Sequence, residues 1–142
     1  MFEKSWRRLT ARLSGKRQSQ LRFTVHRHPE YRSFWHPSET ADQRPGLQIQ
    51  IYLEASNLAG NPCWITAAEI AGMTTVQTVI GVRDVRTREF APDNPLPPRQ
   101  IATVSLRFGI DGPSPAVGEP FRATVILTDH VGEQHPVNVI MH

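Results

Sequence analysis

Histidines are the residues of this sequence whose types and spacing come closest to a chemical site. His26 and His28 lie two residues apart in an extended segment, so their rings are expected on one face. His135 flanks the final hairpin turn, and the first and last strands of many β-sandwiches are neighbours. Three imidazoles with one open position suit zinc or another late first-row metal. Since no carboxylate stands at a recognisable ligand spacing, the sequence favours no metal or other cofactor, and His26, His28 and His135 form the alternative metal site.

The remaining candidate chemistry predicts a chain without catalytic activity. Cys63 alternates with Ile65 on a face expected to be buried, where a thiol packs as a small apolar residue. The sequence has neither a G-x-S-x-G nucleophile motif nor a phosphate-binding glycine motif. A single cysteine excludes an internal disulfide. Together with the lack of a continuous apolar signal core, this favours a reducing, cytoplasmic setting.

The basic charge of the chain is concentrated at its N-terminus. The 142 residues carry a net charge of +3, and their composition, 39% hydrophobic and 20% charged, is ordinary for one soluble domain. Residues 1–28 contain eight basic residues and one acidic residue, a charge of +7. Residues 29–142 contain eight basic and twelve acidic residues, a charge of −4. A basic arm therefore precedes a mildly acidic body, and such arms suit acidic partners, anionic membranes or nucleic acids.

The first residues have the spacing of a short amphipathic helix, and we expect residues 1–20 to form this helix and a linker. The positions that define it are the apolar Phe2, Trp6, Leu9 and Leu13 and the basic Arg7, Arg8 and Arg12. A helix of about twelve residues is marginal in water on its own, so its apolar stripe must be covered. The surfaces that fit are the following domain, a groove on a partner protein, or an anionic membrane surface with the helix as a peripheral anchor. A disordered arm is the remaining alternative.

From residue 21 onward, apolar residues recur at every second position, as in strands with one wet face. We expect seven strands, in the segments 21–25, 47–55, 63–70, 76–85, 104–110, 121–127 and 137–141. In the third segment, Cys63, Ile65 and Ala67 are expected on the inner face. Asp129 and Gly132 occupy the first and fourth positions of a turn between the last two strands. Residues 21–142 therefore predict an all-β domain, an antiparallel β-sandwich.

These strand and turn residues resemble those of bacterial immunoglobulin-like domains. The resemblance covers residues 21–142 and rests on Leu47, Asn57, Pro62 and Ile65, on Leu96-Pro97-Pro98 before a strand, and on Thr128-Asp129 with Gly132 in a closing hairpin. Antibody-type domains have a cysteine pair that brackets a core tryptophan, and the adjacent Cys63 and Trp64 do not replace that pair. The resemblance implies an immunoglobulin-like sandwich that serves as a binding or spacer module, and it implies no activity.

Tyr31, Phe34 and Trp35 lie close together in a segment expected to be a loop. Exposed aromatic residues dominate binding hot spots, so we expect this loop to contact a protein partner. Single-stranded nucleic acid is disfavoured, because the acidic body would repel phosphates away from the basic arm. The sequence thus predicts a non-enzymatic protein-interaction module with a basic N-terminal helix. A histidine-based metal-binding protein and a nucleic-acid binder are the alternatives.

Overall fold

The fold consists of β-strands joined by turns and loops. The structure is a computed structural model, and it describes residues 20–116 and 118–141. Within these ranges a short 3₁₀ turn, η1 (Pro29–Tyr31), accompanies nine strands: β1 (Leu21–Val25), β2 (Phe34–Glu39), β3 (Pro45–Asn57), β4 (Ile65–Ile70), β5 (Thr74–Arg83), β6 (Phe90–Ala91), β7 (Gln100–Asp111), β8 (Phe121–Asp129) and β9 (Gln134–Met141). The predicted all-β class with two antiparallel sheets is confirmed.

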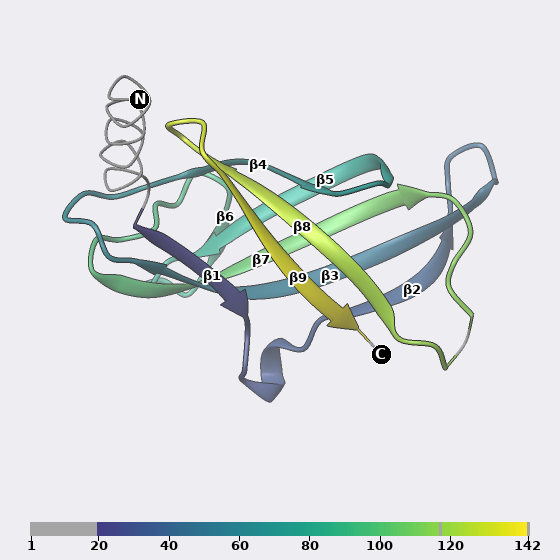
Figure 1. Cartoon of the computed structure of the whole chain (residues 1–142), viewed down its shortest axis with the longest axis horizontal. Helices are drawn as coiled ribbons and strands as arrows, with labels where there is room; N and C mark the ends of the chain where they lie inside the picture. The colour runs from purple at the N-terminus through teal and green to yellow at the C-terminus, as the bar shows by residue number, and fades with distance from the viewer. Residues whose placement is uncertain (1–19, 117, 142) are drawn as a thin grey trace, which may run out of the picture.

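The strands form two antiparallel sheets that lie one over the other (Figure 1). The larger sheet has the order β1-β3-β7-β5-β6, and β2 pairs with β3 beside β1. The smaller sheet has the order β4-β8-β9. The pairing of β3 with β7 runs without a register shift from Gly46 opposite Asp111 to Asn57 opposite Gln100. This ladder is the centre of the larger sheet.

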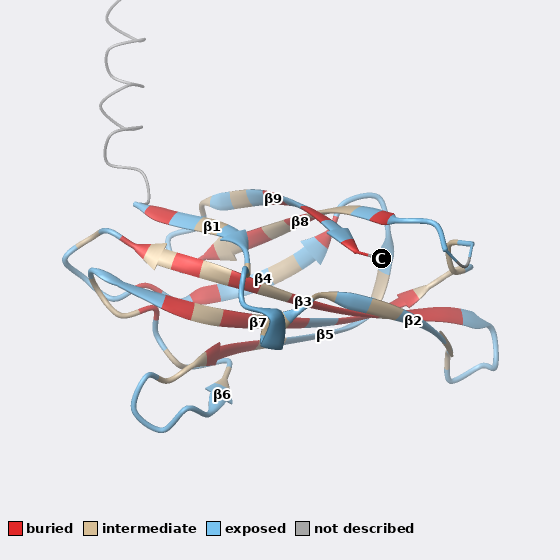
Figure 2. Cartoon of the chain, turned by 90° about the horizontal axis from the view of Figure 1, so that it is seen from below, coloured by how far each residue is buried: buried red, intermediate tan, exposed pale blue. Residues whose placement is uncertain are grey.

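The core lies between the two sheets, because each strand turns alternate side chains inward. On β3 and β7 the inward residues are fully or almost fully buried, and Figure 2 shows the resulting alternation of buried and less buried positions along the strands. The largest fully buried side chains include Phe108, Leu47, Ile49, Ile51, Leu53 and Leu106. Burying a side chain of this size contributes about 1.5–3 kcal/mol, so this alternation drives the pairing of the sheets.

All seven predicted strands occur, and two more strands appear in segments expected to be loops. β6 is a two-residue strand opposite Val82 and Arg83. β2 pairs with β3 from Phe34 opposite Gln50 to Glu39 opposite Pro45. The prediction of a loop around Phe34 and Trp35 is therefore wrong. Pro37 is tolerated in β2 because an edge strand can lose a backbone donor on its open side.

The strand β4 contains an irregularity that changes its inner face. Cys63 and Ile65 are buried as predicted, but the register with β8 shifts between Ile65 and Ala67. After this bulge Ala68 packs against the core and Ile70 is buried, while Ala67 is exposed. The expectation that Ala67 faces inward is wrong, because an extra residue in one strand reverses the faces that follow it.

The predicted amphipathic helix, with Phe2, Trp6, Leu9 and Leu13 as its apolar residues, lies outside the described residues. Within the described ranges, the structure contains no helix with the length and apolarity that a membrane crossing requires.

The alternation on the central strands predicts that two substitutions on the same sheet change the free energy of unfolding by very different amounts. Phe108→Ala, on the inner face of β7, should lower the free energy of unfolding by about 3–5 kcal/mol, because it leaves a cavity between the sheets. Val79→Ala, on the outer face of neighbouring β5, should change it by about 0.5 kcal/mol or less. Urea unfolding followed by fluorescence measures both, and equal losses would contradict the assigned faces.

Candidate functional site

The three residues predicted as a contact loop lie in three different environments. Phe34 is 45% exposed and points from the outer face of the larger sheet. Trp35 points the other way, packs against the core, and meets the ring of Phe121 edge-on at a centroid distance of 6.2 Å. Tyr31 is partly buried against Tyr52. Strand alternation therefore separates neighbours in the sequence and leaves Phe34 as the most accessible of the three.

A row of four directly opposed residues crosses the outer face of the larger sheet. Phe34 of β2 is opposite Gln50 of β3, Gln50 is opposite Arg107 of β7, and Arg107 is opposite Val79 of β5. Directly opposed side chains on one face lie about 4.5–5.5 Å apart at their Cβ atoms, so the four form one continuous surface. Phe34 and Val79, at the two ends of the row, are each 45% exposed.

In the adjacent row, a glycine occupies the middle position. His36 is opposite Gln48, and both Gln48 and Gln77 are opposite Gly109. Because Gly109 has no side chain, Gln48 lies across it, and a Cβ at that position would stand 3.3 Å from Gln48 Nε2. The bulge in β5 brings Val76 to the same place, 3.5 Å from that hypothetical Cβ. The space over Gly109 is therefore already filled by neighbouring side chains, and a larger residue at this position would press against them.

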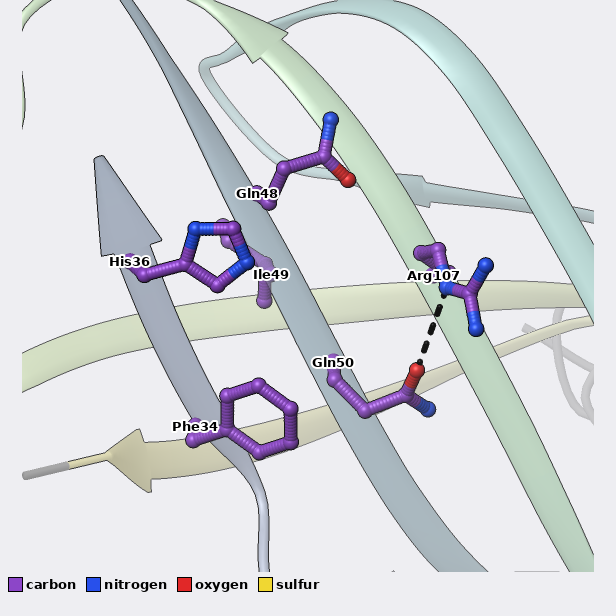
Figure 3. Close-up of a pocket in the computed structure, with 6 residues that line it drawn as sticks. All are labelled: Phe34, His36, Gln48, Ile49, Gln50 and Arg107. Atoms are coloured by element: carbon purple, nitrogen blue, oxygen red, sulfur yellow. Dashed lines mark hydrogen bonds between the residues drawn. The ribbon is translucent and has the colours of Figure 1, made fainter. Parts of the chain in front are cut away.

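These two rows surround a hollow of about 360 Å³ (Figure 3). It is lined by Phe34, His36, Gln48, Ile49, Gln50 and Arg107, which come from β2, β3 and β7. The rings of Phe34 and His36 are nearly parallel, 19° apart, on the β2 side. Arg107 lies on the opposite side, so the hollow has one aromatic wall and one cationic wall. Such a combination suits recognition of a polar group carried on an apolar surface.

Arg107 is held by a short chain of hydrogen bonds that uses only one of its donors. Its Nε donates to Gln50 Oε1 at 3.5 Å, and Gln50 Nε2 donates to Ser105 Oγ at 2.8 Å. Gln50 is 6% exposed, so this amide is anchored within the sheet surface. In the described part of the chain, the terminal guanidinium nitrogens of Arg107 have no hydrogen-bond or ion-pair partner.

Two of the predicted histidines belong to a cluster of rings after β1. His26 contacts Tyr31 at a centroid distance of 4.7 Å, and its Nε2 lies 3.1 Å from Thr103 Oγ1. His28 lies 6.1 Å from Tyr31 and accepts a hydrogen bond from Glu30 N at Nδ1, which caps the 3₁₀ turn. Burial lowers the pKa of His26, with the charge of Glu54 opposing this shift. Both imidazoles thus pack near Tyr31 in the segment that leads from β1 to β2.

The third predicted histidine has a different neighbourhood. His135 Nε2 donates to Asp129 Oδ2 at 3.0 Å, and its ring lies 5.3 Å from Phe23 of β1. The first and last strands are thus close, as expected, but the group with metal-ligand spacing in the described residues is Asp129, Glu133 and His135. The structure does not bring His26, His28 and His135 together as one ligand set.

Asp129 organises the hairpin between β8 and β9. Its Oδ1 accepts hydrogen bonds from the backbone N–H groups of Val131 at 3.0 Å and Glu133 at 2.9 Å. Gly132 N donates to Asp129 O, which closes the predicted turn. Burial opposes ionisation of Asp129, but the bonds from His135, Glu133 and Val131 outweigh it and lower the pKa of this carboxyl group. The carboxylate, 2% exposed, acts here as the acceptor that holds the turn.

Cys63 has the environment of a structural thiol. Its Sγ lies 3.3 Å from His130 Nδ1, the same atom that accepts a hydrogen bond from Trp64 N at 3.2 Å. Nδ1 therefore acts as an acceptor, and the Cys63 thiol lies within hydrogen-bonding distance of it. Burial, and then the charge of Asp129, raise the pKa of the Cys63 thiol, which disfavours the nucleophilic thiolate.

The hollow cannot be read directly from the sequence, although the strands that line it can. Gln48 and Gln50 fall on the outward positions of the predicted strand 47–55, and Arg107 falls on an outward position of the strand 104–110. What was missing was the register that sets Gln50 opposite Arg107. The signal that could have found this face is a polar residue on each of two central strands, Gln50 and Arg107, with Gly109 two residues after the arginine.

The hydrogen bonds to Asp129 predict a pH-dependent loss on substitution. Asp129→Asn should lower the free energy of unfolding by about 1–3 kcal/mol at pH 7. The folded pKa is depressed, so the carboxylate stabilises the fold above the unfolded value of 3.8 and loses this effect as pH falls through the folded value. The difference between wild type and variant should therefore shrink below pH 3.8, as measured by urea unfolding.

The matched control is Glu119→Gln, in the exposed loop before β8, which should leave the unfolding free energy nearly unchanged at pH 7 and at pH 3. A gap between wild type and Asp129→Asn that stays constant from pH 7 to pH 3 would contradict the role assigned to the ionised carboxylate.

Comparison with known proteins gives no family for the chain, because neither the protein-family models nor the curated proteins yield a match.

Proposed function

We propose that this chain is a non-enzymatic, immunoglobulin-like protein-interaction module. Its contact surface is the solvent-facing side of the larger sheet around Phe34, Arg107 and Val79, referred to throughout as the outer face. The single observation that carries the proposal is the row in which an incompletely paired arginine stands between two exposed apolar side chains.

The strand order supports an immunoglobulin-like arrangement. When β2, which lies off the main path of the larger sheet, and the two-residue β6 are set aside, seven strands remain in the described chain, and they form the orders first-second-fifth-fourth and third-sixth-seventh. Immunoglobulin constant-type domains have the same orders, A-B-E-D in one sheet and C-F-G in the other. The outer face then belongs to the A-B-E-D sheet. The shared order supports a fold type and carries no activity with it.

The composition of the outer face supports a contact with protein. Interface centres are enriched in aromatic residues and arginine and depleted in most other charged residues. Phe34, Arg107 and Val79 reproduce that mixture, with the amides of Gln48 and Gln50 between and beside them. A flat sheet face with a shallow hollow can seat a side chain of a partner without rearranging its own backbone.

A non-catalytic role is supported by the engagement of reactive side chains in structure. The Cys63 thiol is bonded to His130, and the Asp129 carboxylate is bonded to the hairpin and to His135. The raised pKa of the thiol opposes covalent chemistry at pH 7. The basic residues 1–19 would add a second contact, to a partner, an anionic membrane or the domain itself, and this part of the proposal rests on sequence spacing and charge.

Affinity capture with paired variants tests the proposal. Phe34→Ser combined with Val79→Ser should reduce the amount of any directly bound partner at least about 30-fold, because two exposed interface anchors are lost at about 1–2 kcal/mol each. Ile140→Ser, at a 47% exposed position on β9 of the smaller sheet, is the matched control and should leave capture unchanged. Quantitative mass spectrometry of proteins retained by each immobilised full-length variant gives the ratio.

Partners retained equally by wild type and by the double variant, or lost only with Ile140→Ser, would place the contact elsewhere and contradict the proposal. Circular dichroism of each variant confirms that the sheets are intact before capture is compared.

A further inference from the structure

We propose that the hollow on the outer face binds a carboxylate of a partner protein, the side chain of an aspartate or glutamate flanked by apolar residues, with Arg107 as its cationic ligand. This inference rests on the proposed function and names the chemistry of the partner at the same surface.

The first argument is that Arg107 presents donors that no residue in the described part of the chain uses. Its Nε is engaged by Gln50 Oε1, and Gln50 is in turn fixed by Ser105. The bond to Nε contacts the guanidinium from one side, and the two terminal nitrogens lie on the side away from Phe34 and His36, at the rim of the hollow (Figure 3). Terminal guanidinium nitrogens match the two oxygens of a carboxylate, and a pre-oriented arginine loses less rotamer entropy on binding.

The second argument is that nearby acidic residues of the described chain do not neutralise Arg107. Asp111, four residues along β7, forms an ion pair with Arg44 at 3.0 Å. Glu54 stands opposite Thr103, also four residues from Arg107 along β7, a separation of about 13 Å. The residues that line the hollow include no carboxylate. Within the described residues Arg107 is therefore an unpaired cation, which a carboxylate of another molecule would complement.

The third argument concerns the walls around the cation. Val79 lies directly beside Arg107 on β5, and Phe34 closes the opposite side of the hollow next to Gln50. Apolar neighbours exclude water when a partner covers the face, and an ion pair gains strength as water is excluded. A carboxylate with apolar flanks can contact Arg107, Val79 and Phe34, whereas a fully hydrated anion can contact only Arg107.

The fourth argument favours a carboxylate of a protein over a phosphate. Phosphate sites combine several cations or a series of backbone N–H groups, and this hollow offers one arginine. His36 Nδ1 lies 3.0 Å from Pro37 O, so this ring nitrogen is already engaged within the chain. The described residues also carry ten basic and twelve acidic side chains, a balance unfavourable to nucleic acid.

The test is an amide-resolved NMR titration of the full-length protein with two tripeptides, acetyl-Val-Glu-Val-amide and acetyl-Val-Gln-Val-amide. The glutamate peptide should shift the amides around Phe34, Gln50 and Arg107 and bind at least ten-fold more tightly than the glutamine peptide. Arg107→Gln should abolish this preference. Arg122→Gln, on the smaller sheet, is the matched control and should preserve it.

Equal binding of the two peptides, shifts confined to other strands, or a preference that survives Arg107→Gln would overturn the inference. Tighter binding of inorganic phosphate or of an oligonucleotide at the same amides would also overturn it. These outcomes remain separate from the proposed function, which is judged by capture with the Phe34 and Val79 variants, in which Arg107 is unchanged.

Discussion

The uninterrupted antiparallel pairing of β3 with β7 is the interaction on which the rest of this structure depends. Its register is continuous over twelve residue pairs, and alternate pairs from Leu47–Ile110 to Ala55–Ala102 direct two apolar side chains into the space between the sheets. A slip of one residue would move each of these side chains to the solvent and each polar partner to the core. The burial of Leu106 and Phe108 therefore fixes the register, and the register fixes where every outward side chain lies.

The outer face is a consequence of the same constraint. Because Ile51 and Leu106 must face inward as a pair, Gln50 and Arg107 must face outward as the next pair. The flanking strands β2 and β5 extend this row to Phe34 on one side and Val79 on the other. A face that combines aromatic, cationic, amide and aliphatic groups thus requires no special backbone geometry. It is built on the central ladder of the larger sheet, and side chains on paired strands are held more precisely than those on loops.

Much of this fold could be predicted from two-residue alternation, and the exceptions have local causes. The strand 47–55 was predicted because Leu47, Ile49, Ile51 and Leu53 alternate with polar residues. The bulge after Ile65 was missed because an inserted residue leaves no mark in composition. β2 was missed because Pro37 and two adjacent aromatic residues hide its alternation, and its stability comes from pairing with β3 rather than from its own propensity.

The candidate site could be predicted only in part, since it depends on the pairing of distant residues. Phe34 was identified from its aromatic ring, but the same argument selected Trp35, which the strand turns against Phe121. Arg107 and Gln50 are 57 residues apart in the chain, and only the register shows that they are neighbours. The histidines were selected by type and near-spacing. Asp129, which binds His135, was assigned to the turn but not to the histidine.

The most direct test of this account is a measurement of the register itself, by cross-strand nuclear Overhauser contacts in the isotope-labelled protein. The account predicts contacts that place Phe34 opposite Gln50, Gln50 opposite Arg107, and Arg107 opposite Val79. Contacts that align Arg107 with Ile49 or Ile51 would contradict it, since a one-residue slip would turn the arginine toward the core and remove the outer face.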